Sequence, residues 1–216
     1  MHLKKQGRSV DPESLRGKLV VFEGADGAGK TTLATAMETF LVDAGVECVR
    51  CAFPGMEAGT VGHLVYRIHH GRADFGISHL TETSLQALHV AAHVDAIETR
   101  ILPAMAAGSC VLLDRFWWST WVYGRVGGIP LRILTPLIRF EKAVWGTARP
   151  EAVVHLVKPV CKSPTLAREY DGLAAREARS VRIVRIDVVG GVEETLLAAT
   201  QALGKRDSSV RRSRGR

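Results

Sequence analysis

The residues best suited to chemistry in this sequence form the run Gly24-Ala-Asp-Gly-Ala-Gly-Lys30-Thr31. It matches the pattern G-x-x-x-x-G-K-[ST], whose glycines let successive backbone N–H groups curl around an anion. In such a loop Lys30 reaches the β- and γ-phosphates of a nucleotide, and the Thr31 hydroxyl is a ligand for Mg²⁺. The predicted phosphate-binding set is Gly24, Ala25, Asp26, Gly27, Ala28, Gly29, Lys30, Thr31 and Thr32.

A second pair of suitable residues, Asp114 and Arg115, follows the apolar run 109–113. A carboxylate directly after a buried strand is typical of an acid that holds Mg²⁺ beside the phosphates of a P-loop. An arginine next to it can bind a phosphate through two parallel hydrogen bonds. An ordinary surface acid and a solvent-facing arginine are the alternatives. We therefore predict Thr31 and Asp114 as magnesium ligands and Arg115 as a phosphate-binding cation.

The elements that must position these residues alternate between apolar strands and amphipathic helices. Short β-branched runs predict strands at 18–24, 46–53, 109–115, 151–157 and 180–188. Apolar residues at helical spacing predict helices at 31–45, 60–70, 80–107, 131–146, 165–178 and 192–204. Because the strands are apolar throughout, we expect an α/β fold: a three-layer sandwich with a parallel sheet covered by helices on both faces. Ligands then bind outside the carboxyl ends of the strands.

The positive charge of the chain is concentrated at its two ends. The 216 residues carry a net charge of +7, of which +2 lies in residues 1–16 and +5 in residues 205–216. We predict a flexible basic segment at 1–16, one P-loop domain at 17–204 and a disordered basic tail at 205–216. Contact of the tail with nucleic acid is the minority alternative.

The composition restricts the class of protein. A content of 46% hydrophobic and 24% charged residues is typical of a globular domain. No apolar run reaches 18 residues, so no membrane span is expected. The four cysteines, Cys48, Cys51, Cys110 and Cys161, are too few and too scattered for a disulfide framework. We therefore predict a reducing, cytoplasmic location, with Cys48 and Cys51 as structural cysteines.

Five segments of the sequence together resemble the thymidylate kinases. They are FEGADGAGKTT (22–32), the pair Phe53-Pro54, AAHVDAIETRILPAMAAG (91–108), DRFWWSTWVYG (114–124) and ARPEAVVHL (148–156). They occur in the order and spacing of that family, over about residues 18–200. The resemblance implies a P-loop kinase fold with a five-stranded parallel sheet, and a homodimer formed through helices. It also implies ATP- and Mg²⁺-dependent phosphoryl transfer to a nucleoside monophosphate, with dTMP or a related pyrimidine nucleotide expected.

The resemblance also implies roles for individual residues. Lys30, Arg115 and Asp26 are the implied catalytic residues, and Asp26 orients the acceptor or a metal-bound water. Asp187, at the end of the last strand, is implied to lie near the adenine of ATP. The implied acceptor-binding residues are Phe53, Arg67, His93, Arg115, Ser119 and Tyr123.

The sequence departs from the family pattern at three places. His93 replaces a base-reading arginine, and an imidazole cannot present the same fork of donors to a pyrimidine carbonyl. Only the segment 158–164 stands where the family has an arginine-rich lid, and the candidates to replace its arginines are Lys158, Lys162 and Arg168. Five rings crowd the acceptor side, either to stack on a base or as core or dimer packing: Phe116, Trp117, Trp118, Trp121 and Tyr123.

These departures leave two other functions open. The chain could phosphorylate a modified nucleotide, or a base or end within DNA, because an acceptor side without a long lid could admit a polymer. It could also be a catalytically weak nucleotide-binding regulator, because a charge-stabilising arginine is worth a thousandfold or more in phosphoryl transfer.

Overall fold

The five apolar runs form one parallel sheet in the order β2-β3-β1-β4-β5. The structure, a computed structural model, describes residues 9–160 and 163–205. The strands are β1 (Leu19–Glu23), β2 (Cys48–Ala52), β3 (Cys110–Asp114), β4 (Ala152–Val157) and β5 (Ile183–Asp187). Each strand lies within its predicted range, and all four pairings are parallel, which confirms the predicted sheet.

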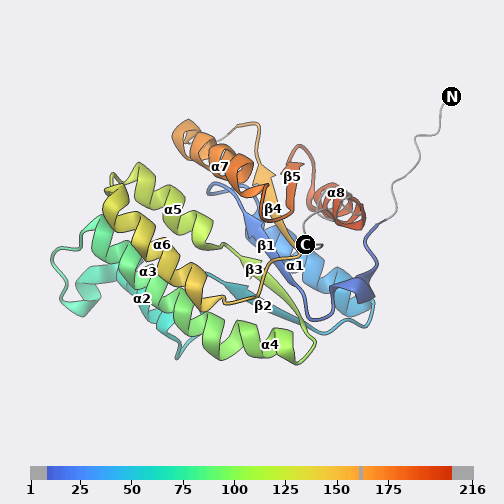
Figure 1. Cartoon of the computed structure of the whole chain (residues 1–216), viewed down its shortest axis with the longest axis horizontal. Helices are drawn as coiled ribbons and strands as arrows, with labels where there is room; N and C mark the ends of the chain where they lie inside the picture. The colour runs from blue at the N-terminus through green and yellow to red at the C-terminus, as the bar shows by residue number, and fades with distance from the viewer. Residues whose placement is uncertain (1–8, 161–162, 206–216) are drawn as a thin grey trace, which may run out of the picture.

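Helices form the connections between the parallel strands and cover both faces of the sheet (Figure 1). The α-helices are α1 (Lys30–Asp43), α2 (Val61–Gly71), α3 (Glu82–Ala96), α4 (Leu102–Ala106), α5 (Trp117–Val126), α6 (Leu131–Val144), α7 (Pro164–Glu177) and α8 (Val192–Gly204). Short 3₁₀ turns occur at η1 (Pro12–Leu15) and η2 (Arg72–Phe75), and η3 (Ile97–Ile101) is a π-helical turn. Among the described residues, no helix combines the length and apolar character needed to span a bilayer.

The alternation of side chains along the strands divides the core into two parts. On β1, Leu19 and Val21 belong to a cluster that packs against α5, α6 and α7, whereas Val20 and Phe22 belong to a cluster that packs against α1 and α8. Successive strand residues point to opposite faces, so a central strand with helices on both sides must be apolar throughout. The sheet is thus packed on both faces, which fixes the position of the carboxyl ends of its strands.

The long helix predicted at 80–107 is present, with a π turn inside it. η3 separates α3 from α4, and the N–H of Leu102 bonds to the carbonyl of Ile97. Pro103 follows directly and lacks the N–H that a regular helical bond would require. The wider turn keeps the helix continuous in spite of the proline, as a π-bulge can.

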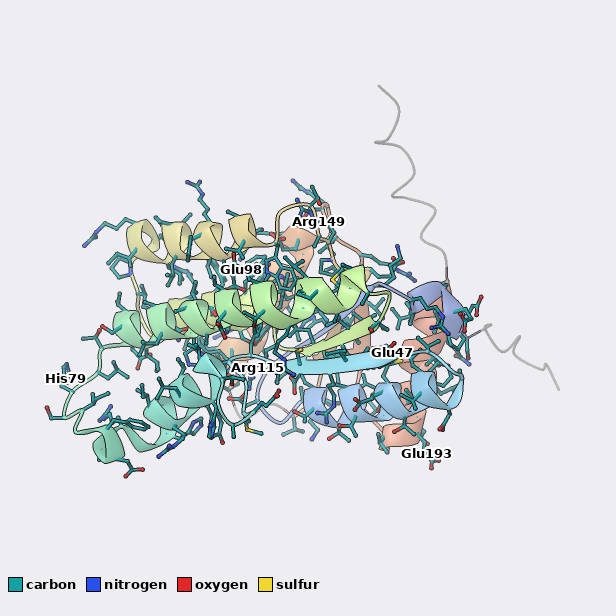
Figure 2. The ribbon with its side chains drawn as sticks, turned by 90° about the horizontal axis from the view of Figure 1, so that it is seen from below. Glu47, His79, Glu98, Arg115, Arg149 and Glu193 are labelled. Carbon is teal, nitrogen blue, oxygen red and sulfur yellow. The ribbon has the colours of Figure 1, made fainter. Side chains whose placement is uncertain are left out.

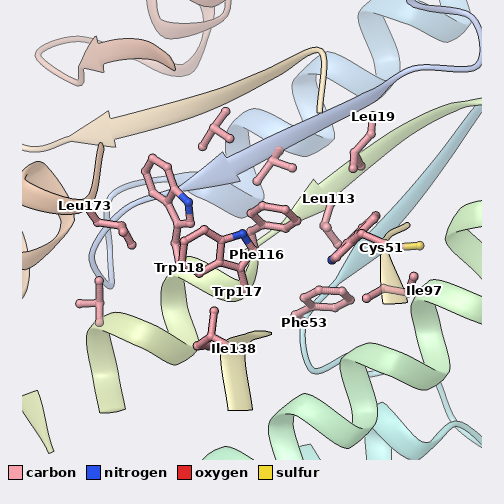
Figure 3. Close-up of a cluster of buried hydrophobic side chains, with 14 of the residues drawn as sticks. Leu19, Cys51, Phe53, Ile97, Leu113, Phe116, Trp117, Trp118, Ile138 and Leu173 are labelled. Atoms are coloured by element: carbon pink, nitrogen blue, oxygen red, sulfur yellow. The ribbon is translucent and has the colours of Figure 1, made fainter. Parts of the chain in front are cut away.

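Helix α5 was not predicted from the sequence. Its apolar residues have no clear helical period, because buried residues occupy most sides of the helix. Figure 3 shows Phe116, Trp117 and Trp118 inside the core beside Phe53 and Leu113. All three rings are buried, so core packing is their role and stacking of these rings on a base is excluded in this conformation.

The segment preceding β1 is packed against the domain from residue 9 onward. Leu15 is buried, and the N–H of Val10 bonds to the carbonyl of Thr200 in α8. The expectation of a flexible segment is therefore wrong for residues 9–16. Residues 1–8 and the predicted tail beyond Lys205 lie outside the described residues.

The first turn of α2 depends on a close backbone approach at Gly62. A Cβ atom on Gly62 would lie 1.9 Å from the carbonyl oxygen of Pro54. We expect Gly62→Ala to lower the free energy of unfolding by about 1–3 kcal/mol, because the backbone must move to relieve the overlap. Urea denaturation measures this change.

The matched control is Gly172→Ala in α7, where an added Cβ would meet nothing closer than the flexible end of Arg176 at 3.8 Å. This helical position should gain up to about 1 kcal/mol from the better helix former. Equal effects at the two positions would contradict the close approach at Gly62.

Candidate functional site

The phosphate loop leaves the sheet between β1 and β4, at a place where only glycine fits. Gly24 has φ 146°, and a Cβ there would lie 2.4 Å from the carbonyl oxygen of Leu156. Gly29 has φ 95° and is the N-cap of α1. The two glycines turn the chain from the end of β1 into the start of α1, whose N-terminus is a favourable place for an anion.

Lys30, in the first turn of α1, is folded back under this loop. Its Nζ donates hydrogen bonds to the carbonyl oxygens of Gly24 at 2.8 Å and Ala25 at 3.0 Å. Burial and the neighbouring charge of Arg115 lower the pKa of the Lys30 ammonium, while nearby carboxylates oppose that shift. The charged form of Lys30 is therefore destabilised at the loop, and a bound phosphate would stabilise it.

Thr31 and Asp114 meet across the sheet as the sequence predicted. The hydroxyl of Thr31 donates a hydrogen bond to Oδ2 of Asp114, which lies at the end of β3. Asp114 is 7% exposed, and its Oδ1 has no hydrogen-bond partner among the described residues. A hydroxyl beside a carboxylate with an unpartnered buried oxygen fits the oxygen ligands and the preference for retained waters of Mg²⁺.

Arg115 is held in a left-handed backbone conformation and points toward the phosphate loop. Its φ is 74°, the only positive value of a non-glycine residue in the described part of the chain. Its Nη2 forms an ion pair with Asp26 at 2.5 Å, and its Nη1 donates to the Ser119 hydroxyl at 3.3 Å. The guanidinium also lies 5.9 Å from the centre of the Tyr123 ring. Figure 2 labels Arg115 near the centre of that view, and its side chain is 29% exposed.

Asp26 stays ionised at neutral pH in these surroundings. Burial alone would raise the pKa of its carboxyl, but Tyr123 and Arg115 more than offset burial, so the pKa lies below its usual value. Burial and Asp26 together raise the pKa of the Tyr123 phenol, which therefore remains protonated. The structure thus brings four residues of the predicted site together: Asp26, Arg115, Ser119 and Tyr123.

A buried carboxylate that the sequence reading missed lies beneath this group. Glu23, the last residue of β1, is fully buried. Its Oε1 accepts from the backbone N–H groups of Phe116 at 2.7 Å and Ser119 at 3.0 Å. Its Oε2 accepts from the Ser119 hydroxyl at 3.0 Å and from the N–H of Gly24 at 3.3 Å. Glu23 therefore joins the start of the phosphate loop to the turn that carries Arg115.

The same network extends to α7 through Tyr170. The buried hydroxyl of Tyr170 lies 2.9 Å from Oγ of Ser119. Burial and the carboxylate of Glu23 raise the pKa of this phenol well above its ordinary value, so it remains a neutral hydroxyl. The helix after β4 is in this way connected to the phosphate loop.

Two cavities adjoin the phosphate loop on the side of β4 and β5. One of about 140 Å³ lies between residues 25–28 of the loop, the end of β4 and α7. The other, of about 160 Å³, lies between the start of α1 and the β5–α8 loop, where Gly190 and Gly191 line it. These cavities are adjacent and lead from the loop toward β5. This is the expected position of a nucleotide whose phosphates occupy the loop.

The other candidate residues of this side are placed less directly. Asp187 ends β5 as predicted, but it pairs with Arg185 at 3.2 Å and does not line either cavity. Of the candidates to replace the lid arginines, Lys158 lines both cavities. Arg168 lies on α7 within 3.5 Å of Thr165. Lys162 lies outside the described residues.

Two of the predicted acceptor-binding residues are buried against each other on the opposite side of the loop. Phe53, 3% exposed, and His93, 2% exposed, stack with ring centres 3.9 Å apart and planes 9° apart. Arg67 is exposed on α2 and lies over the ring of Phe75, with no described contact to Arg115. Ser119 and Tyr123 are thus the predicted acceptor residues that the structure places beside Arg115.

A histidine pair that the sequence did not single out as a pair lies beside His93. His89 Nε2 lies 3.2 Å from His69 Nδ1, which joins α3 to α2. Burial and the charges of neighbouring histidines lower the pKa of His89 to about 3. Burial also lowers the pKa of His69, so the imidazoles of His69 and His89 are neutral at physiological pH.

Sequence signals for the missed residues exist but are weak. Glu23 could have been noticed as an acid that ends an apolar strand, next to the loop. Tyr170 contacts Ser119, and Glu141 is a buried partner of His93. Both residues lie on helices, and no local sequence pattern indicates which of their side chains face the site. Their role depends on tertiary contacts between segments distant in sequence.

We expect Glu23→Ala to lower the free energy of unfolding by about 2–4 kcal/mol, because buried donors on the Arg115 turn lose their acceptor. Glu23→Gln should cost less, since the amide oxygen still accepts from two backbone N–H groups. The control is Glu13→Ala, which removes an exposed, solvent-screened pair with Arg16 and should leave the free energy of unfolding nearly unchanged. Chemical denaturation measures the free energy of unfolding of each variant. A loss for Glu23→Ala no larger than the loss for Glu13→Ala would contradict the role of Glu23 in the network.

Acidification should destabilise the protein partly through His89. Its pKa is about 3 in the folded state and about 6.5 in an unfolded chain. Between these values the unfolded state binds more protons, so the free energy of unfolding falls by at most about 1.4 kcal/mol per pH unit as pH decreases. His89→Gln should show a smaller loss between pH 7 and pH 5 than the unmodified chain in denaturant titrations. The exposed His79→Gln should reproduce the unmodified loss, and identical losses for all three proteins would refute the assignment.

Comparisons with known proteins agree with this arrangement. A family model for thymidylate kinase matches residues 22–168. The thymidylate kinase of Thermoanaerobacter sp. (strain X514) is 39% identical over 110 residues, which are 50% of this chain and 51% of the relative. That of Rhodopseudomonas palustris (strain TIE-1) is 32% identical over 158 residues, 68% of this chain and 61% of the relative. The matches thus span about half to three fifths of the length of these curated relatives.

A solved structure shows the same fold. The thymidylate kinase of Ehrlichia chaffeensis superposes with a TM-score of 0.71 at 19% identity, over 86% of this chain and 98% of that chain. The family model covers the phosphate loop, both members of the Asp114-Arg115 pair and the start of α7. On these grounds the chain belongs to the thymidylate kinase family.

Proposed function

We propose that this protein transfers the γ-phosphoryl group of ATP to a pyrimidine nucleoside monophosphate such as dTMP. The observation that carries the proposal is the convergence of Lys30, Thr31, Asp114 and Arg115 from two distant segments around one end of the sheet. The family membership supports phosphoryl transfer of this kind. The cavities along β4 and β5 favour that side for ATP and leave the side of α2, α3 and α5 for the acceptor.

Thr31 and Asp114 would hold Mg²⁺, which neutralises charge on the phosphate oxygens when bound. Their fit rests on the unpartnered buried Oδ1 of Asp114 and on the Thr31 hydroxyl beside it. Lys30 would bind the phosphates from within the loop, and Arg115 would bind a phosphate from the acceptor side.

The proposed reaction needs positioning more than a strong base. The acceptor phosphate is already anionic, so its oxygen can attack in line without losing a proton to the protein. Asp26 would fix the Arg115 guanidinium and orient the acceptor, since it already forms the ion pair. Lys158, which lines both cavities, is the described residue best placed to supply positive charge in place of a lid arginine.

Phosphorylation of a base within DNA, one of the alternative functions, loses one supporting observation in this structure. Phe116, Trp117 and Trp118 are buried in the core, so they offer no stacking platform for a base of DNA. A regulator without turnover stays a separate outcome of the same assay. A homodimer also stays a prediction, for which the exposed apolar residues Leu131, Ile133 and Phe140 of α6 provide a candidate surface.

We expect Lys30→Ala to reduce kcat for ADP formation with dTMP by at least about a thousandfold, because the variant loses the ammonium that neutralises negative charge on the transferring group. The circular dichroism spectrum should stay unchanged. Asp114→Asn should raise the Mg²⁺ concentration needed for half-maximal rate. As a control, exposed Lys18→Ala should keep the full rate. A Lys30→Ala variant with most of its activity would refute the assignment, and tight ATP binding without turnover on any acceptor would favour the regulator.

A further inference from the structure

The hydroxyl of Ser119 on α5 uses all of its hydrogen-bonding capacity inside the protein. Its Oγ lies 3.0 Å from Oε2 of Glu23, 2.9 Å from the hydroxyl of Tyr170 and 3.3 Å from Nη1 of Arg115. A hydroxyl has one hydrogen to donate and two lone pairs that accept. Three partners therefore saturate Ser119, which is buried at 8% exposure. This leaves the side chain no free hydrogen bond for a ligand.

The chemistry of the three partners fixes the direction of each hydrogen bond. The guanidinium of Arg115 has hydrogens on all of its nitrogens and only donates. The single hydrogen of Ser119 is donated to the carboxylate of Glu23, so the hydroxyl of Tyr170 must donate its own hydrogen to Ser119. The raised pKa of the Tyr170 phenol agrees with this role, because the neutral phenol keeps that hydrogen. One lone pair of Ser119 thus faces Tyr170, and the other faces Arg115.

The guanidinium of Arg115 has two side-chain anchors that differ in burial. Nη2 pairs with Asp26 of the phosphate loop, whose side chain is 62% exposed, whereas Nη1 bonds to the buried Ser119. An exposed carboxylate exchanges its partner for water or a bound ligand at little cost. The hydroxyl of Ser119 has no such freedom, because Glu23 and Tyr170 hold it from the other sides. Ser119 is therefore the fixed anchor of the guanidinium.

Tyr170 brings a helix that is distant in sequence into this arrangement. It lies on α7, which packs against α5, and its hydroxyl bonds to Ser119 across 51 residues of sequence. The side chain of Tyr170 is fully buried, so water cannot replace its hydroxyl as the donor to Ser119. Without this donor one lone pair of Ser119 would be empty, and the hydroxyl could turn away from Arg115.

We propose that Tyr170 and Ser119 are positioning residues for Arg115: Tyr170 orients the hydroxyl of Ser119, and Ser119 holds the guanidinium in place to bind a phosphate. Neither side chain contacts the reacting atoms, so this role differs from the acceptor binding that the family resemblance implies for Ser119. This inference rests on the proposed function, because it concerns a cation that the proposed reaction uses.

The first test removes the hydroxyl of Tyr170 and keeps its ring, which lines the cavity beside the phosphate loop. We expect Tyr170→Phe to lower kcat for ADP formation from ATP and dTMP by about three- to tenfold, the effect of one lost hydrogen bond. KM for ATP should stay within about twofold. The matched control is Tyr66→Phe on α2, which removes the same group outside this network and should leave kcat unchanged. An unchanged kcat for Tyr170→Phe would overturn the inference.

The second test separates an effect on Arg115 from a general effect on the fold. When the guanidinium is already absent, as in Arg115→Ala, the hydroxyl of Tyr170 has nothing left to position. We therefore expect the further change Tyr170→Phe to alter the remaining kcat by less than about twofold in that background. The same three- to tenfold loss in both backgrounds would show that Tyr170 acts on the phosphate loop or on the fold, and would overturn the inference.

A measurement on the protein without substrates keeps the inference testable if no acceptor is turned over. Hydrogen bonds to both Nη atoms slow the rotation of a guanidinium about its Nε–Cζ bond, and NMR of ¹⁵N-labelled arginine side chains measures this rotation. We expect the Arg115 signal, assigned by its loss in Arg115→Lys, to show faster rotation in Tyr170→Phe than in the unmodified chain. Ser119→Ala should have the same effect, and it tests the contact if Tyr170→Phe does not fold.

The two kinds of measurement distinguish failure of the inference from failure of the proposed function. Faster rotation in the variants of a protein that shows no turnover would refute the proposed function alone. Equal rotation in the variants and in the unmodified chain would overturn the positioning role of Tyr170 and Ser119, whatever the rate of turnover.

Discussion

The burial of one carboxylate at the end of β1 is the constraint on which the rest of the site depends. Glu23 cannot reach solvent, so its oxygens must find donors within the protein, and the donors come from the phosphate loop and from the turn after β3. That turn places Arg115 in a left-handed conformation, a strain that persists only where the surroundings fix it. The arginine faces Asp26 because the backbone beneath it is bonded to Glu23.

The two sides of the phosphate loop differ in chemistry. The side of β4 and β5 has two cavities, lined in part by glycines and Lys158, and is the side proposed for ATP. The other side is closed by aromatic and imidazole rings, with His93 between Phe53 and Glu141. Positive charge is therefore concentrated at the loop itself, in Lys30 and Arg115. This agrees with a chain whose net charge lies at its ends and not in its domain.

Much of the fold follows from local patterns. All five strands lie within the ranges expected from apolar runs, because strands buried on both faces cannot tolerate polar positions. Helix α5 was not predicted, because burial on most of its sides removes the helical period of apolar residues by which helices are recognised in a sequence. The π turn before Pro103 was equally hidden, since a proline in a helical pattern predicts an end as readily as a wider turn.

For the site, the sequence by itself determined the groups proposed to bind phosphate. Lys30 and Thr31 are fixed by the spacing of the loop, and Asp114 and Arg115 by their place after a buried strand, because parallel strands bring their carboxyl ends to one edge. Only the tertiary structure decided how the side of the loop next to α2, α3 and α5 is built. Phe53 and His93 were expected to bind the acceptor, but their rings stack on each other, and His93 is also bonded to Glu141, 48 residues farther along the chain. Contacts between segments so far apart leave no local sequence pattern, because they depend on how the helices pack in the folded chain.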